Sequence, residues 1–271
     1  MIALRSLAFQ ILFYANLIGQ LLLFSPVFFL LPERTCWRIV KNWARSSLWL
    51  LHRVAGTKSE IVGQENLPDG ATIIASKHQS FWETFALVPE LDRPTFILKK
   101  ELMAIPVFGA YCRRMGMIPV DRSRRGAALA SMLEDAQKAM AGGRQIVIFP
   151  EGTRSAPGAV PNYRPGIHFI YNATNVPVTP VALNSGLFWP RQAFYRRPGT
   201  IRAEFLPPIE PGLDRAAFLA RLTDEIEAQS IALMRRAYEE QPELPMSKLV
   251  ASRLGHCLLY TSDAADDSLR V

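Results

Sequence analysis

At residues 71–84 the chain reads ATIIASKHQSFWET, in which an apolar, β-rich run passes directly into a cluster of polar side chains. Residues 145–154 read QIVIFPEGTR and repeat this arrangement. Short apolar runs bounded by turn residues are typical of buried strands. In parallel α/β sheets, ligands bind beyond the carboxyl ends of the strands. The two stretches therefore predict two strand ends that converge on one cleft.

Around these stretches, β-rich runs alternate with helical ones. We expect strands at residues 71–76, 94–98, 117–120, 145–149, 176–183 and 200–206. Residues 127–141 place apolar side chains on one helical face, and residues 214–240 predict a long amphipathic helix. Strands that alternate with helices of this size form βαβ units. The pattern predicts an α/β fold over residues 56–245, with a largely parallel sheet flanked by helices.

The beginning of the chain is apolar, since residues 6–32 carry no charged side chain. A continuous helix of that length reaches roughly 40 Å, more than the roughly 30 Å of bilayer hydrocarbon. Such a helix could span a membrane, but Pro26 interrupts its hydrogen bonds, so a helical hairpin that enters one leaflet is the alternative. A buried core helix is the third possibility. We predict a membrane-associated helical segment over residues 1–55.

The charges that flank this segment predict its orientation. Basic residues follow it at Arg34, Arg38, Lys41 and Arg45, whereas Arg5 alone precedes it. Because basic residues collect on the cytoplasmic side, the bulk of the chain is expected there, at a bacterial inner (cytoplasmic) membrane.

The overall composition is that of a basic globular protein, with 49% apolar and 20% charged residues. Residues 246–271 are expected to form a C-terminal tail. Within it, residues 256–271 (HCLLYTSDAADDSLRV) continue no periodic pattern and resemble translated adapter sequence, so we interpret them as a non-native artefact. Without those residues, which hold three of the 24 acids and one of the 31 bases, the net charge rises from +7 to +9. Such a charge favours nucleic acid, anionic lipid headgroups or phosphorylated small molecules as partners.

The three cysteines, Cys36, Cys112 and Cys257, are widely spaced and form no CxxC motif. Neither a disulfide framework nor a thiolate metal site is therefore predicted.

The first polar cluster contains a candidate general base. If His78 lies in the loop and Glu83 in the first helical turn, the carboxylate can accept from one imidazole nitrogen and leave the other free as a base. The structural alternative is a capping box, Ser80–Glu83, in which Glu83 only satisfies backbone donors.

Two further clusters could bind an anion. Gly152 permits a tight turn, and Arg154 with nearby backbone donors could hold an oxyanion or phosphate. The run at residues 116–122 ends in Arg122, whose guanidinium also suits a phosphate. Each cluster could equally be a solvated surface turn.

Taken in order, these motifs resemble those of the glycerolipid acyltransferase family, specifically the 1-acyl-glycerol-3-phosphate acyltransferases. Residues 78–83 resemble its block of His, four residues and Asp, with Glu83 in the place of Asp. Residues 116–122, 149–154 (Phe-Pro-Glu-Gly-Thr-Arg) and 176–181 resemble its other blocks. The resemblance implies that His78, held by Glu83, removes the proton from an acceptor hydroxyl, which attacks the thioester of acyl-CoA or acyl carrier protein. The product would be phosphatidic acid.

The resemblance also implies a substrate site. Arg122 and Arg154 would contact the acceptor phosphate, and Val178 with Pro180 would line apolar surface near the acyl chain. The full set of substrate-binding residues implied is Lys99, Lys100, Arg122, Glu151, Gly152, Thr153, Arg154, Val178 and Pro180. The implied chemistry requires no metal ion and no cofactor, and the implied partners are a membrane lipid acceptor and the thioester donor.

Other functions remain as alternatives. Another lyso-lipid, such as lyso-ornithine lipid, could be the acceptor, and the Glu83 departure leaves room for a non-catalytic lipid-binding relative. A serine hydrolase is disfavoured because the chain has no GxSxG motif. Nucleic-acid binding is disfavoured because the arginines at 113–125 lack interleaved aromatic residues.

Overall fold

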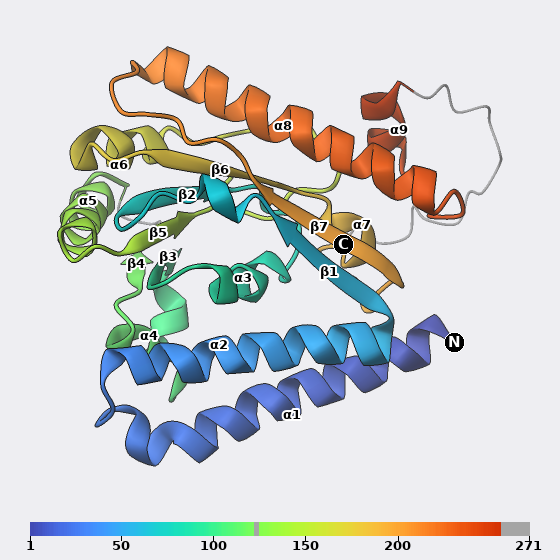
Figure 1. Cartoon of the computed structure of the whole chain (residues 1–271), viewed down its shortest axis with the longest axis horizontal. Helices are drawn as coiled ribbons and strands as arrows, with labels where there is room; N and C mark the ends of the chain where they lie inside the picture. The colour runs from blue at the N-terminus through green and yellow to red at the C-terminus, as the bar shows by residue number, and fades with distance from the viewer. Residues whose placement is uncertain (122–124, 256–271) are drawn as a thin grey trace.

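The computed structural model describes residues 1–121 and 125–255, and in this part of the chain a seven-stranded sheet has the order β1-β7-β6-β2-β5-β3-β4 (Figure 1). The strands are β1 (Thr57–Val62), β2 (Thr72–Ser76), β3 (Pro94–Lys99), β4 (Ile118–Val120), β5 (Gln145–Ile148), β6 (Val178–Leu183) and β7 (Gly199–Phe205). Neighbouring strands are parallel except β6 and β7, which are antiparallel. The expected α/β fold with a largely parallel sheet is confirmed.

The helices are α1 (Ile2–Phe28), α2 (Glu33–Leu50), α3 (Glu83–Ala86), α4 (Phe108–Arg114), α5 (Arg125–Ala141), α6 (Gly166–Thr174), α7 (Ser185–Phe188), α8 (Arg215–Glu240) and α9 (Lys248–Leu254). The two helices expected from periodicity are confirmed as α5 and α8. Asp214 caps α8, because its carboxylate accepts from the backbone N–H of Ala217 at 2.9 Å.

The central strands are buried on both faces, which explains their continuous apolar runs. Ile73 of β2 and Ile146 of β5 pack in a core cluster with residues of α5, α6 and α8. Ile74 and Val147, the next residue of each strand, pack in a second cluster on the other face, which α1 and α2 cover. Figure 1 shows α8 on one side of the sheet and α2, then α1, on the other.

The N-terminal segment forms a helical hairpin in which α1 and α2 lie side by side (Figure 1). The polar residues of α1 connect the two helices: Asn16 Nδ2 donates to the hydroxyls of Ser46 and Ser47 at 2.9 and 3.1 Å. Phe9 and Phe13 of α1 are buried in the core cluster beneath the sheet. Most of α1 is exposed, and α1 is long and apolar enough to cross a membrane.

The structure contains several elements that the sequence patterns do not predict, among them β1 and α9. Strand β1 lies at the edge of the sheet and pairs with β7. Because it contains polar residues and is only partly buried, it has no apolar run that would predict a strand. Helix α9 falls within the segment expected as a tail, yet Val250 and Leu254 pack in the core. Residues 256–271, including Cys257, lie outside the described residues.

Candidate active site

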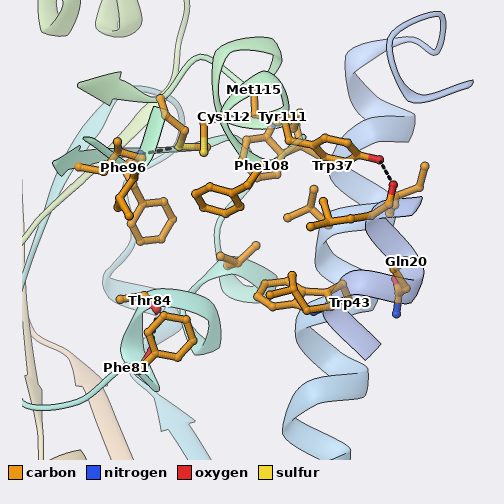
Figure 2. A pocket seen from close by; sticks show the side chains of 18 of the residues that line it. Gln20, Trp37, Trp43, Phe81, Thr84, Phe96, Phe108, Tyr111, Cys112 and Met115 are labelled. Atoms are coloured by element: carbon orange, nitrogen blue, oxygen red, sulfur yellow. Dashed lines mark hydrogen bonds between the residues drawn. The ribbon is translucent and has the colours of Figure 1, made fainter. Parts of the chain in front are cut away.

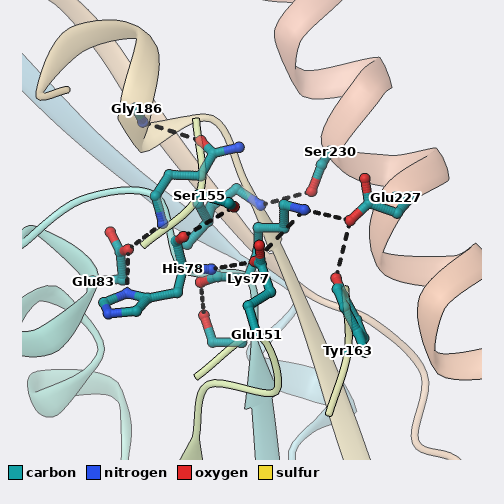
Figure 3. A network of polar contacts seen from close by, with 12 residues as sticks. Lys77, His78, Glu83, Glu151, Ser155, Tyr163, Gly186, Glu227 and Ser230 are labelled. Carbon is teal, nitrogen blue, oxygen red and sulfur yellow. Dashed lines mark hydrogen bonds and ion pairs between the residues drawn. The ribbon is translucent and has the colours of Figure 1, made fainter. Parts of the chain in front are cut away.

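His78 lies in the loop that follows β2, with its imidazole against the first turn of α3 (Figure 3). Its Nδ1 is 2.9 Å from Oε1 of Glu83, a carboxylate that is fully buried. Because a carboxylate only accepts, Nδ1 is the donor in this contact, and the lone pair of the neutral imidazole is then on Nε2. One face of the imidazole ring stacks on the ring of Phe149, with the ring centroids 4.0 Å apart. The imidazole is therefore held in one orientation and one tautomer.

Glu83 makes both sets of contacts that were considered from sequence. Its Oε1 accepts from the backbone N–H groups of Gln79 and Ser80, each at 2.7 Å, as a capping residue does. The same oxygen accepts from His78, and Oε2 accepts from the hydroxyl of Ser185 at 2.9 Å. Four donors thus compensate the buried charge and fix the carboxylate beside the imidazole.

The second motif meets the first because β2 and β5 are neighbours in the sheet. The backbone N–H of His78 donates to Glu151 Oε1 at 3.1 Å, and the backbone N–H of Ser155 donates to the carbonyl of His78 at 2.8 Å. Gly152 makes the turn between them with a φ of +70°, in the left-handed region that glycine favours. The predicted convergence of the two strand ends is confirmed.

A buried network of charges connects these two loops to α8 (Figure 3). Lys77, only 3% exposed, forms ion pairs with Glu151 at 3.6 Å and with Glu227 of α8. The hydroxyl of Tyr163 donates to Glu227 at 3.1 Å. Burial, with Glu227 nearby, raises the pKa of this phenol far above its usual value, so the phenol stays a donor. Sequence reasoning missed the network, since its members are far apart in the chain.

The structure brings only part of the implied substrate site together. Thr153 is exposed and Arg154 half-buried beside the His78 loop. Lys99 and Lys100, at the end of β3, are exposed and pair with Glu101 at 3.1 Å and Asp121 at 3.3 Å. Arg122 lies outside the described residues.

Val178 and Pro180 are not brought to this site. Side chains alternate along β6, and Val178 packs in the cluster with α6 and α8, on the opposite face from Val181. Pro180 shares the side of Val178 because it is two residues further along the strand.

Two cavities adjoin the motif residues. An apolar cavity of about 280 Å³ lies between the helical hairpin and the β3–β4 edge, and Figure 2 shows its lining side chains. Phe149, the ring that stacks on His78, is part of its wall. A second, more polar cavity of about 440 Å³ is lined by Arg154 and Arg196. Phe81 lines both cavities, which places the His78 motif between them.

No group of three or more His, Cys, Asp or Glu side chains within residues 1–121 and 125–255 could hold a metal ion. Cys36 and Cys112 are free and buried.

Known proteins are similar to this chain in sequence and in fold. Residues 58–184 match the Acyltransferase family. A 1-acyl-sn-glycerol-3-phosphate acyltransferase of Pseudomonas aeruginosa is 35% identical over 83% of this chain and 88% of its own length. The mouse 1-acyl-sn-glycerol-3-phosphate acyltransferase alpha is 29% identical, over 64% of this chain and 62% of its own. The crystal structure of the 1-acyl-sn-glycerophosphate acyltransferase PlsC of Thermotoga maritima, 21% identical, matches 92% of this chain and 100% of its own with a TM-score of 0.72.

Proposed function

We propose that this chain, which belongs to the acyltransferase family that includes the 1-acyl-sn-glycerol-3-phosphate acyltransferases, acylates the sn-2 hydroxyl of 1-acyl-glycerol-3-phosphate. The acyl donor is acyl-CoA or acyl carrier protein, and the product is phosphatidic acid, a precursor in phospholipid biosynthesis. The observation that carries the proposal is the 2.9 Å contact of His78 Nδ1 with Glu83 Oε1 beside an apolar cavity.

In this reaction His78 acts as a general base. Its Nε2 takes the proton of the acceptor hydroxyl while the hydroxyl oxygen attacks the carbonyl carbon of the donor thioester. When the C–S bond breaks, the sulfur leaves with the electron pair and the imidazolium returns the proton to it. Glu83 accepts from Nδ1 throughout and stabilises the imidazolium. General-base catalysis of this kind contributes roughly 10²- to 10⁴-fold in rate.

The apolar cavity supports a fatty acyl chain as the group transferred. Its walls come from α1, α2, β3 and α4 and are almost wholly apolar. Each CH₂ group that leaves water for such a site contributes about 0.8 kcal/mol. Phe149 connects the cavity wall to the face of His78. We therefore assign the cavity to the acyl chain of the donor, with its carbonyl end at the imidazole.

The exposed face of α1 supports membrane association. Leu4, Ile11, Ile18 and Leu22 follow one another along this face and are between 54% and 73% exposed. On the opposite face, Phe9 and Phe13 are at most 3% exposed in the core. If α1 spanned the bilayer, Phe9 and Phe13 would have to leave their contacts in the protein core and enter the hydrocarbon. We therefore propose that α1 inserts its exposed face into the cytoplasmic leaflet, with the basic residues of α2 toward anionic headgroups.

The direct test is transfer of a labelled acyl group by the purified, detergent-solubilised protein. His78→Ala should abolish transfer, whereas His52→Ala, a change at an exposed histidine, should retain it. Arg154→Ala should chiefly raise the KM for the acceptor. Wild-type rates in His78→Ala would overturn the base assignment, and no transfer by the wild type would favour a lipid-binding protein without activity.

The acceptor is tested by mass spectrometry of the products from a panel of lyso-lipids. Preference for 1-acyl-glycerol-3-phosphate is expected. Preference for lyso-ornithine lipid would be consistent with acyl transfer as the reaction class, but it would overturn the assignment of 1-acyl-glycerol-3-phosphate as the acceptor.

A further inference from the structure

The polar cavity beside the active site contains a buried arginine. Arg196 lies in the segment between α7 and β7 and is only 7% exposed. Its guanidinium lies over the ring of Trp189, 4.1 Å from the centroid. Its Nη1 donates to the carbonyl groups of residues 193, 194 and 195 at 2.8, 3.0 and 3.2 Å. The side chain is therefore held by neutral groups of its own loop.

In the part of the chain that the structure describes, the charge of Arg196 has no acidic partner. No carboxylate in residues 1–121 and 125–255 forms an ion pair with it, and its Nε is buried without a hydrogen-bond partner. Burial lowers the pKa of Arg196 to about 10, so the guanidinium remains protonated at neutral pH. A buried charge without a partner is costly, and a bound anion would compensate it.

The rest of the cavity also suits an anion. Arg154 forms another part of the wall, and its carbonyl accepts from Arg191 Nη1 at 3.1 Å. Among the described residues, the lining contains these two cations, Arg154 and Arg196, and no Asp or Glu. Gln10 of α1 also lines the cavity, and its side-chain oxygen is buried without a hydrogen-bond partner. The cavity thus places positive charge beside an amide side chain whose hydrogen bonds are incomplete.

Helix α1 connects this cavity to the side of the molecule where lipid is expected. The hydroxyl of Ser6 accepts from the backbone N–H of Arg196 at 2.7 Å, which fastens the arginine loop to α1. Phe9, Gln10, Phe13 and Tyr14 then form the α1 wall of the cavity. Helix α1 therefore contributes both to the wall of this cavity and to the exposed apolar surface that we assign to the membrane.

We propose that this cavity binds the phosphomonoester headgroup of the lysolipid acceptor, with Arg196 and Arg154 on the phosphate and Gln10 on the glycerol. The inference rests on the proposed function and adds Arg196 and a residue of the N-terminal helix to the acceptor site. Phe81, shared with the apolar cavity, separates the headgroup from the acyl chain of the donor.

Steady-state kinetics of Arg196→Met test the proposal. We expect the KM for 1-acyl-glycerol-3-phosphate to rise about tenfold or more, because a charge-assisted contact is lost, while the KM for the donor stays unchanged. Arg196→Lys, which keeps the charge, should restore part of the affinity. The matched control is Arg197→Met, since Arg197 bonds Leu187 and Tyr195 in the same loop and does not line the cavity. Its acceptor KM should equal that of the wild type.

Further arms identify the ligand. Inorganic phosphate should compete with the acceptor in the wild type and compete less in Arg196→Met, and 1-acyl-glycerol, which lacks the phosphate, should bind both proteins equally weakly. A rise in the donor KM instead would assign Arg196 to the phosphates of the donor and overturn the proposal. An unchanged acceptor KM in Arg196→Met would also overturn it.

Two measurements keep the test decisive. If Arg196→Met does not fold, Gln10→Glu serves in its place, because a carboxylate in the cavity should repel the phosphate and raise the acceptor KM by a similar factor. Binding of 1-acyl-glycerol-3-phosphate to His78→Ala, followed by tryptophan fluorescence, then measures the site without turnover. Failure of the proposed function would appear as no transfer by the wild type. Failure of this inference would appear as transfer by the wild type together with an acceptor KM that is unchanged in Arg196→Met and in Gln10→Glu.

Discussion

Glu151 Oε1 lies 3.1 Å from the backbone nitrogen of His78 and 3.6 Å from Nζ of Lys77. The carboxylate of the Phe-Pro-Glu-Gly-Thr-Arg motif is thus bonded to the loop that carries the base. It is 6% exposed. These contacts predict that Glu151 positions the loop of the base, whereas the family resemblance implies that it binds substrate.

Glu151→Gln tests this role. The amide oxygen can still accept from the backbone N–H of His78, but the ion pair with Lys77 is lost. We expect kcat to fall about tenfold, as a misplaced base would cause, with little change in the KM for the acceptor. Glu151→Ala should be slower still. A raised acceptor KM with an unchanged kcat would instead indicate that the carboxylate binds substrate.

Lys77 connects the active-site loops to α8, and its removal should destabilise the fold. Lys77→Met leaves Glu151 and Glu227 buried without this cation, which typically costs about 3 to 5 kcal/mol in the free energy of unfolding. Glu227→Gln in that background should recover part of the loss, because one uncompensated charge is removed. Denaturant unfolding of the single and double variants measures the coupling.

The matched control for Lys77 is an exposed ion pair. Lys138 and Glu134 of α5 are 68% and 67% exposed at their side chains, so Lys138→Met should leave stability unchanged within error. If Lys77→Met lowered the free energy of unfolding by no more than Lys138→Met does, a structural role of the buried network would be contradicted.

The features that were predictable from the sequence depend on local periodicity. The apolar run of β2 is buried on both faces, and the helical repeat of α8 begins at its Asp214 cap. The polar edge strand β1 has no such pattern, and it is defined by its pairing with β7. The contacts of His78 with Glu83 follow from a five-residue spacing. Those of Lys77 with Glu227 join positions 150 residues apart, which only the assembled fold brings together.

Glu83, found where the family resemblance has Asp, is expected to be required at its full length. Its Oε1 reaches His78 and two backbone donors while Oε2 reaches Ser185. Glu83→Asp shortens the side chain by roughly 1.5 Å, so some of these contacts must lengthen beyond hydrogen-bond range. We expect kcat to fall about tenfold or more with both substrate KM values retained. Faster turnover in Glu83→Asp would show that the loop is not fitted to Glu.

Glu83→Gln separates the effect of the negative charge of Glu83 from the effect of its side-chain length. The amide keeps the length of the side chain but removes the charge that stabilises the imidazolium, and its NH₂ group favours the wrong imidazole tautomer. We expect a loss of roughly 10²- to 10⁴-fold in kcat. Similar rates for Glu83→Gln and the wild type would exclude the carboxylate from catalysis.

Cys112 lines the apolar cavity and allows its depth to be tested. Cys112→Phe adds a ring to the wall of α4, so less of the cavity is left for an acyl chain (Figure 2). Competition between donors of different length should shift toward shorter chains. Cys112→Ala, which removes the thiol without filling the cavity, should keep the wild-type preference. The same preference in both variants would place the acyl chain elsewhere.

The thiol of Cys112 provides a second, independent measure of this cavity. Burial raises its pKa to about 11, so roughly one thiol in a thousand is ionised at pH 8. In a background of Cys36→Ala and Cys257→Ala, alkylation by iodoacetamide should be slow at pH 8 and accelerate about tenfold for each pH unit toward pH 11. A non-hydrolysable acyl-CoA analogue should protect the thiol, because its chain fills the cavity. Labelling as fast as that of a free cysteine at pH 8 would show that water reaches Cys112, and lack of protection would contradict the assignment of the cavity to the acyl chain.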